Sequence, residues 1–133
     1  MGKIRILVVD DDLVIREGLR RILDARDYIV ETFANGPLAI ERMAEHSFDL
    51  VITDLKMPGM NGIEVLKPLK ALQPEVPIIM ITGFSTVDTA VDAMKNGATD
   101  YLLKPFDPNE LGVIVEKIMS RQAEILENQY LKA

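Results

Sequence analysis

The fold of this chain is decided by residues 4–12, which read IRILVVDDD. A short, nearly continuous apolar run of this kind is typical of a parallel strand buried on both faces. Three aspartates then end the run abruptly. The same arrangement recurs at residues 49–54, where DLVIT precedes Asp54. We therefore expect buried parallel strands that end in acidic residues.

Between these runs the chain alternates strand patterns with helical patterns. Strands are predicted at residues 4–9, 28–33, 49–53, 76–81 and 100–103. The segments between them, and residues 111–119, carry apolar residues at the three- and four-residue spacing of amphipathic helices. Five strand–helix repeats predict an α/β fold, a parallel sheet with helices on both faces and right-handed crossovers.

Proline and aspartate mark details of the helices. Asp107 followed by Pro108 predicts the start of the last helix, because aspartate caps helix N-termini and proline fits the first turn. Asp12, directly before an apolar helical pattern, is expected to cap the first helix. Pro68 falls inside the third helical pattern and predicts a kink or a shifted helix there.

Length and composition bound the class of protein. The chain of 133 residues has room for one domain, and its 48% apolar and 27% charged residues are ordinary for a globular protein. A net charge of −6 argues against direct nucleic-acid binding. The absence of cysteine excludes disulfides, zinc–thiolate sites and thiol catalysis. No membrane-length apolar run and no signal peptide are present, so we expect a cytoplasmic protein without membrane contact.

Polar side chains follow four of the five predicted strands. These are residues 10–12 after the first strand, Asp54 after the third, Thr82 after the fourth and Lys104 after the fifth. Parallel strands bring their carboxyl ends to one edge of the sheet, where such folds bind ligands. Two carboxylates about 4 Å apart repel by roughly 4 kcal/mol at an effective dielectric constant of about 20, so a cation is needed to offset the repulsion. Ligands that are all oxygen favour Mg²⁺.

Each of these residues alone also has an ordinary explanation. Asp10 and Asp11 could form a turn or cap a helix, Thr82 could be a turn residue, and Lys104 could be a solvated surface lysine. Their joint arrival at one edge of one sheet favours a functional site. Phosphoryl transfer to a carboxylate suits this set, because such reactions need a positioned nucleophile and groups that neutralise charge on the phosphoryl oxygens.

Four ordered motifs carry a resemblance to a known family. They are LVVDD at residues 7–11, VITDLKMPGMNG at 51–62, MITG at 80–83 and GATDYLLKPF at 97–106. Together they resemble the receiver domains of bacterial two-component response regulators. The resemblance implies a receiver over residues 1–119 with a flavodoxin-like, doubly wound five-stranded sheet in the order 2-1-3-4-5 and five helices, the last one extended.

The resemblance also implies roles for the acidic residues. Asp54 matches the residue that accepts a phosphoryl group from a sensor histidine kinase. Asp11 matches a direct Mg²⁺ ligand and Asp10 a ligand that acts largely through water. The backbone carbonyl of Lys56 matches the position that completes the protein ligands. A receiver is a regulatory phosphoacceptor that promotes only its own phosphorylation and dephosphorylation, so we do not expect a conventional enzyme.

Other residues match the switching parts of a receiver. Thr82 and Lys104 match the hydroxyl and the ammonium that each bind a phosphoryl oxygen. Tyr101 matches an aromatic that rotates inward when the threonine hydroxyl moves toward the phosphate. Pro105 matches a proline usually preceded by a cis peptide bond. The surface that responds would comprise the fourth helix, the fifth strand and the fifth helix.

Two positions predict slow loss of the phosphoryl group. Lys56 and Phe84 each lie two residues beyond a site residue, Asp54 and Thr82 respectively. They flank the expected path of the hydrolytic water, and neither can act as a base at neutral pH. We therefore expect slow hydrolysis of the acyl phosphate.

The C-terminal residues 120–133 continue the last helical pattern. The ending ENQYL at 127–131 and the run TVDTAVDAMKNGA at 86–98 resemble NtrC-like activators, which work with an alternative sigma factor. The resemblance implies that 120–133 link the receiver to a missing output domain, an AAA+ or another effector domain. Ile118, Ile125 and Leu126 could form a seam for a homodimer, although Gln122 and Gln129 interrupt it.

Two alternatives remain open at this point. A stand-alone phosphorelay receiver would use the same chemistry without an output domain. A phosphatase with an aspartate nucleophile would use the spacing of Asp10 and Asp12, but Val14 occupies the place where that family has threonine.

Overall fold

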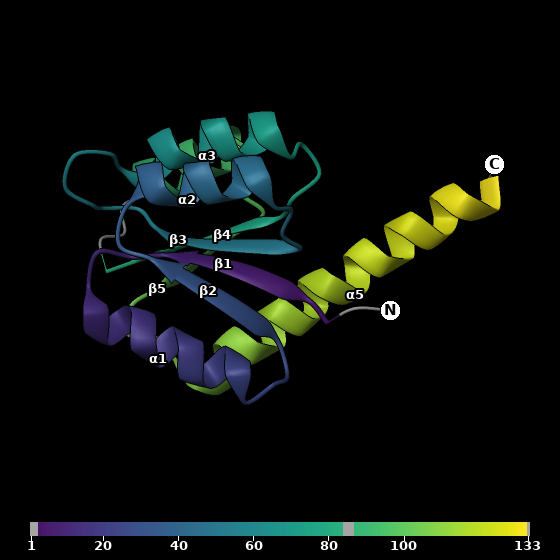
Figure 1. Ribbon diagram of the computed structural model, residues 1–133, viewed down its shortest axis with the longest axis horizontal. Coiled ribbons are helices and arrows are strands. Elements are labelled where there is room, and N and C mark those ends of the chain that lie inside the picture. Colours follow the sequence, from purple (N-terminus) through teal and green to yellow (C-terminus); the bar gives the residue numbers. More distant parts are fainter. Residues whose placement is uncertain (1–2, 84–86, 133) are drawn as a thin grey trace.

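The structure is a computed structural model that describes residues 3–83 and 87–132, without the side chains of Val87 and residues 128–132. In this part of the chain, strands alternate with helices (Figure 1). Their bounds are β1 Arg5–Val9, α1 Leu13–Asp24, β2 Ile29–Phe33, α2 Gly36–Glu45, β3 Leu50–Asp54, α3 Gly62–Leu72, β4 Ile78–Thr82, α4 Val87–Lys95, β5 Asp100–Leu103 and α5 Pro108–Lys132. All five predicted strands are confirmed, with small differences at their ends.

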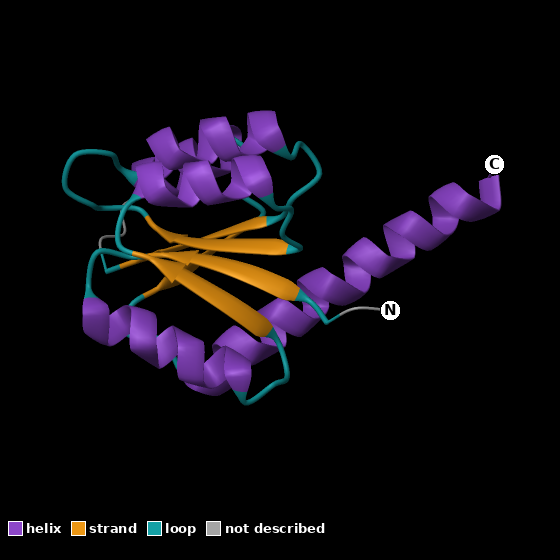
Figure 2. Cartoon of the chain, in the orientation of Figure 1, coloured by secondary structure: helices purple, strands orange, loops and turns teal. Residues whose placement is uncertain are grey.

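The strands form one parallel sheet in the order β2-β1-β3-β4-β5. This order confirms the doubly wound topology that the receiver resemblance implied. Helices α2 and α3 cover one face of the sheet, and α1 and α5 cover the other (Figures 1 and 2). The winding reverses between β1 and β3, so the carboxyl ends of these two strands border the crevice where such folds bind ligands.

The residues of β1 show why its apolar run is unbroken. Leu7 and Val9 are buried in the core that includes Leu66 of α3, whereas Ile6 and Val8 are buried in the core that includes Leu19 of α1. Successive side chains of a strand point to opposite faces, and both faces are covered here. The sheet is therefore packed on both faces, and this packing fixes the strand ends that form its carboxyl edge.

Helix α3 passes through Pro68. Of the two expectations for this position, a shifted helix is wrong. The helix begins with a capping box, in which the Asn61 side chain accepts from the Glu64 N–H and the Glu64 carboxylate accepts from the Asn61 N–H. Val65 and Leu69 are fully buried on either side of the proline. This burial and the cap offset the backbone hydrogen bond that Pro68 cannot make.

The predicted helix starts at Asp12 and Asp107 are confirmed. The Asp12 carboxylate accepts from the N–H of Val14 at 2.8 Å, and the Asp107 carboxylate accepts from the N–H of Asn109 at 2.8 Å. Helix α5 then runs to Lys132, and its C-terminal half extends beyond the sheet (Figure 1). Among the described helices, α5 included, we find none with the length and hydropathy that crossing a bilayer requires.

Candidate functional site

The carboxyl edge of the sheet brings the site residues together. Asp54 is the last residue of β3 and pairs with Ile81 in β4, so it belongs to the strand rather than to the loop after it. Thr82 is the buried last residue of β4. Its carbonyl accepts from the backbone N–H of Lys104 at 2.8 Å, which holds the residue after β5 beside β4. The expected convergence of these residues is therefore present.

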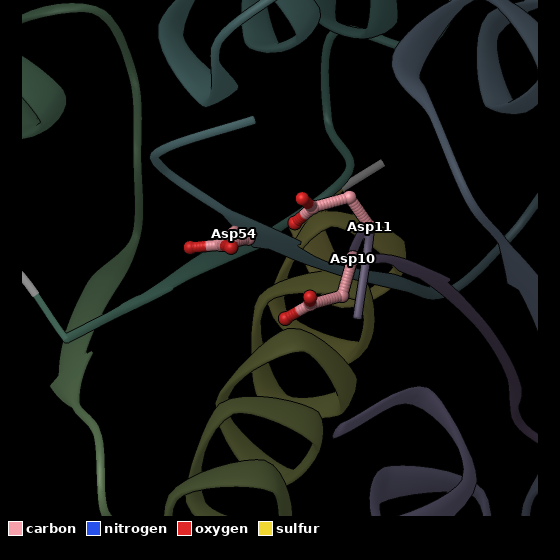
Figure 3. A group of neighbouring side chains, drawn as sticks. All are labelled: Asp10, Asp11 and Asp54. Carbon is pink, nitrogen blue, oxygen red and sulfur yellow. The ribbon is translucent and has the colours of Figure 1, made fainter. Parts of the chain in front are cut away.

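Three carboxylates gather at this edge. Asp10, Asp11 and Asp54 each offer one oxygen, and these oxygens lie within 4.8 Å of one another. Figure 3 shows the three side chains extending in the same direction from the ends of β1 and β3. Asp10 is 1% exposed and Asp54 7% exposed, whereas Asp11 is open to solvent. Together with Lys104 we call these residues the site cluster.

Lys104 is the cation of the site cluster. Its Nζ lies 2.8 Å from Asp10 Oδ2 and 3.3 Å from Asp54 Oδ2. Burial opposes the charged ammonium, but the hydrogen bond to Asp10 and the charges of Asp10 and Asp54 outweigh it and raise the pKa of Lys104. The peptide bond between Lys104 and Pro105 is cis, as the resemblance implied.

One ammonium does not balance these carboxylates. Burial and the neighbouring charge of Asp10 raise the pKa of Asp54 above its usual range, although Lys104 and the backbone N–H of Lys56 act in the opposite direction. The Lys56 N–H lies 3.4 Å from Asp54 Oδ1. The site cluster therefore carries negative charge in excess of its own cation.

The third aspartate of the triplet has a different task. Asp12 uses its carboxylate to cap α1 and donates its backbone N–H to Asp10 Oδ1 at 2.9 Å. A phosphatase of the kind considered above needs Asp10 and Asp12 as a reacting pair. The capping bond of Asp12 gives no support to that alternative.

Glycine at position 62 allows the loop after Asp54 to close. A Cβ on Gly62 would collide with the backbone carbonyl of Asp54, with Leu55 and with the Met80 side chain. The Gly62 N–H also donates to the Leu55 carbonyl at 2.7 Å. Residue 62 lies within one of the quoted motifs, but only the close approach of α3 to β3 reveals this steric requirement.

Of the expected switch residues, Tyr101 contacts α4. Tyr101 is half-buried in β5, and its hydroxyl lies 3.5 Å from Thr89 Oγ1 of α4. Lys56 is exposed. Phe84, which with Lys56 was expected to slow hydrolysis, lies outside the described residues, as does Thr86 at the start of the NtrC-like run.

The donor set of the site cluster fits Mg²⁺. The three carboxylates offer only oxygen atoms, within a span that one ion could bridge. The single histidine of the chain, His46, is an exposed residue at the end of α2. Hard divalent cations select oxygen ligands, and excess negative charge favours their binding.

Comparisons with known proteins agree with this geometry. The family model described as the response regulator receiver domain matches residues 6–116. The transcriptional regulatory protein ZraR of Salmonella typhimurium is 45% identical over 123 residues, which cover 92% of this chain and 28% of ZraR. The DNA-binding transcriptional regulator NtrC of Escherichia coli K12 is 42% identical over 117 residues, which cover 88% of this chain and 25% of NtrC.

A solved structure extends the similarity to the long last helix. NtrX from Brucella abortus superposes with a TM-score of 0.91 at 30% identity, over 98% of this chain and 30% of that one. The chain thus spans less than a third of ZraR, NtrC and NtrX.

Proposed function

This chain belongs to the family of response regulator receiver domains and resembles its NtrC-like members, and from that premise we propose that it is a switch operated by phosphorylation of Asp54. A receiver is a regulatory domain. The donor would be the phosphohistidine of a sensor kinase, in the cytoplasm. The observation that carries the proposal is the buried Asp54 carboxylate, with the Lys104 ammonium 3.3 Å away and the Asp10 and Asp11 carboxylates beside it.

The proposed transfer needs little covalent chemistry from the protein. An Asp54 oxygen would attack the phosphorus in line, the bond from phosphorus to the histidine nitrogen would break, and the nitrogen would leave with the electron pair. The Lys104 ammonium and the Thr82 hydroxyl would each bind one phosphoryl oxygen. The product is an acyl phosphate. Lys104 would neutralise part of its negative charge, and Thr82 would donate a hydrogen bond to it.

Mg²⁺ fits this proposal as a cofactor. Asp10, Asp11 and Asp54 would hold it, together with the backbone carbonyl of Lys56. When bound, the ion would supply positive charge to the carboxylates and to the phosphoryl oxygens. The excess negative charge of the site cluster supports this assignment.

The phosphoryl group would be read out at α4, β5 and α5. Movement of the Thr82 hydroxyl toward the phosphate would leave room for the Tyr101 ring, which now lies beside Thr89 of α4. Lys104, which would bind the phosphoryl group, and Pro105 after it would transmit the movement into the loop before α5. Since α5 is one continuous helix to Lys132, it offers a direct connection from the site to whatever follows the receiver.

We assign residues 1–119 to the receiver and 120–133 to a linker. An output domain in cis, an AAA+ or another effector domain of a transcription activator, would follow. The length of the relatives supports this part of the proposal, because the chain spans 28% of ZraR. Ile125 and Leu126 are exposed on α5 and would pair two copies of the chain.

The test is covalent. Incubation with acetyl phosphate and Mg²⁺ should add one phosphoryl group, measured by intact-protein mass spectrometry. The adduct should be absent from Asp54→Ala and present in Asp12→Ala, which removes a neighbouring carboxylate that only caps α1. An adduct of equal yield in Asp54→Ala would overturn the assignment.

A further inference from the structure

The loop between β1 and α1 is held at every polar group of Asp10. The Asp10 N–H donates to the Phe33 carbonyl at 3.1 Å, and its Oδ1 accepts from the N–H of Asp12 at 2.9 Å. Its Oδ2 accepts from Lys104 Nζ at 2.8 Å. Its backbone carbonyl accepts from Arg16 Nη1, also at 2.8 Å. Three of these partners are backbone groups or members of the site cluster, and Arg16 is neither.

Arg16 reaches this carbonyl from the end of the first turn of α1. Asp10 follows the last residue of β1, so its carbonyl marks the point where the chain leaves the sheet. A buried carbonyl that loses its partner costs about 1–3 kcal/mol, and a guanidinium gives a stronger hydrogen bond than a neutral donor. The bond therefore resists rotation of the peptide unit that joins Asp10 to Asp11. That peptide unit sets the directions of both side chains toward Asp54.

A second arginine on the same helix provides a comparison. Arg20 lies one turn beyond Arg16 and is also half-buried. It donates to Thr32 Oγ1 at 3.0 Å and lies 3.9 Å from Glu17 Oε2. These contacts lead to β2 and to α1 itself, not to the loop of residues 10–12. The two arginines thus have the same charge on the same helix but different partners.

We propose that Arg16 is a positioning residue for the magnesium site, acting through the backbone carbonyl of Asp10. The inference rests on the proposed function. By fixing the peptide unit between Asp10 and Asp11, Arg16 keeps both carboxylates within reach of the ion that Asp54 also binds. It does so despite its own positive charge, which by itself disfavours a nearby cation.

Because Arg16 is positively charged, a purely electrostatic role and a positioning role predict opposite changes in Mg²⁺ affinity when Arg16 is removed. If Arg16 acted only through its charge, its removal would tighten Mg²⁺ binding. If it positions the loop, its removal weakens binding, as losses of groups that orient metal ligands do. The sign of the change therefore separates positioning from bulk electrostatics.

The experiment measures Mg²⁺ affinity without any phosphoryl donor, from the amide NMR shifts of the loop of residues 10–12 and of Asp54. Arg16→Met should weaken Mg²⁺ binding about tenfold. Arg20→Met, the matched control, should leave it within about twofold or tighten it slightly. Arg16→Lys should recover part of the loss, because a lysine can donate to one carbonyl but lacks the planar fork of arginine.

Unchanged or tighter binding in Arg16→Met overturns the proposal, as does equal weakening in Arg16→Met and Arg20→Met. Urea unfolding without Mg²⁺ shows whether each variant is folded. If Arg16→Met does not fold, Arg16→Lys and Arg20→Lys replace the pair, and only the first should weaken binding. If the wild type binds Mg²⁺ but takes no phosphoryl group, the proposed function fails while the ranking of affinities still tests Arg16.

Discussion

Two clusters of charged side chains lie on this sheet. Carboxylates outnumber cations in one of them, and cations outnumber carboxylates in the other. The site cluster sets Asp10, Asp11 and Asp54 against Lys104. The second, which we call the framework cluster, sets the carboxylate of Glu31 in β2 between two guanidiniums. Arg5 Nη2 of β1 lies 2.7 Å from Glu31 Oε2, and Arg42 Nε of α2 lies 2.8 Å from Glu31 Oε1.

The two carboxylates at the centre of these clusters respond in opposite directions. Burial works against the charge of Glu31, but hydrogen bonds and charges from Arg42 and Arg5 outweigh it and lower the pKa of Glu31. Burial and Asp10 instead raise the pKa of Asp54. The ionised carboxylate of Glu31 is thus stabilised by the arginines of its own cluster. The ionised carboxylate of Asp54 is destabilised in its cluster, which favours the binding of further cations and hydrogen-bond donors. Such a perturbed carboxylate at the ligand-binding edge is typical of a functional site.

The largest stability change should follow from breaking the framework cluster. Glu31→Gln leaves two half-buried guanidiniums facing a neutral amide, and we expect a loss of about 2 kcal/mol in the free energy of unfolding. Urea unfolding at neutral pH measures it. The control is Glu17→Gln, because Glu17 is exposed and 3.9 Å from Arg20; it should change stability by less than about 0.5 kcal/mol. Equal losses in the two variants would remove the distinction.

The pH dependence of that loss has a definite sign. Since the pKa of Glu31 is lowered in the folded state from 4.5, its contribution is fully present above pH 4.5 and disappears as the pH falls through the folded-state pKa. The stability gap between wild type and Glu31→Gln should be constant from neutral pH to 4.5 and narrow below it. A gap that narrows between pH 7 and pH 5 would contradict this account.

A smaller change of opposite sign should follow at the site cluster. Because the raised pKa of Asp54 means that its charge is unfavourable in the folded state, Asp54→Asn should stabilise the metal-free protein at neutral pH by about 1 kcal/mol. Urea unfolding in EDTA measures the gain. Mg²⁺ should then stabilise the wild type more than the variant, which has lost one of the carboxylate ligands. If the variant is less stable than the wild type in EDTA, the charge of Asp54 is not unfavourable in the metal-free fold and the prediction is wrong.

The smallest effect separates two neighbours in the acidic triplet. Asp12→Ala removes a helix cap and should cost about 0.5–1 kcal/mol while Mg²⁺ affinity changes little. Asp11→Ala removes an exposed carboxylate of the site cluster, so its stability should stay near that of the wild type while Mg²⁺ affinity falls. Calorimetric titration and urea unfolding give both quantities. Equal losses of affinity in the two variants would mean that the triplet is misassigned.

The two clusters also differ in how well the sequence predicted them. The site cluster was predictable because parallel strands all point their carboxyl ends to one edge, so residues 10, 11, 54 and 104 meet there, together with Thr82. The framework cluster was not, because its members lie within strands and a helix. They meet through the register of β1 with β2, in which Arg5 pairs with Ile29, and through the packing of α2, which carries Arg42. Pattern alone does not specify such lateral contacts.

Arg16 and Pro68 are two further residues whose structural environment could not be predicted from the sequence pattern. Arg16 escaped notice because its partner is a backbone carbonyl, and every residue has one. Pro68 suggested a kink or a shifted helix because proline disfavours helix interiors, yet the helix is not shifted, and the capping box and the buried Val65 and Leu69 stabilise α3 around the proline. Local propensity is a weak guide where tertiary packing decides.

The most direct test of the central claim, that the excess charge of the site cluster serves phosphorylation of Asp54, is to locate the phosphoryl group. Borohydride reduces an acyl phosphate to an alcohol with release of phosphate, and so converts the modified aspartate to homoserine. After treatment with acetyl phosphate and Mg²⁺, then borohydride and proteolysis, peptide mass spectrometry should find homoserine at position 54. Homoserine at position 10 or 11, or none in a protein that has gained the phosphoryl mass, would contradict the account.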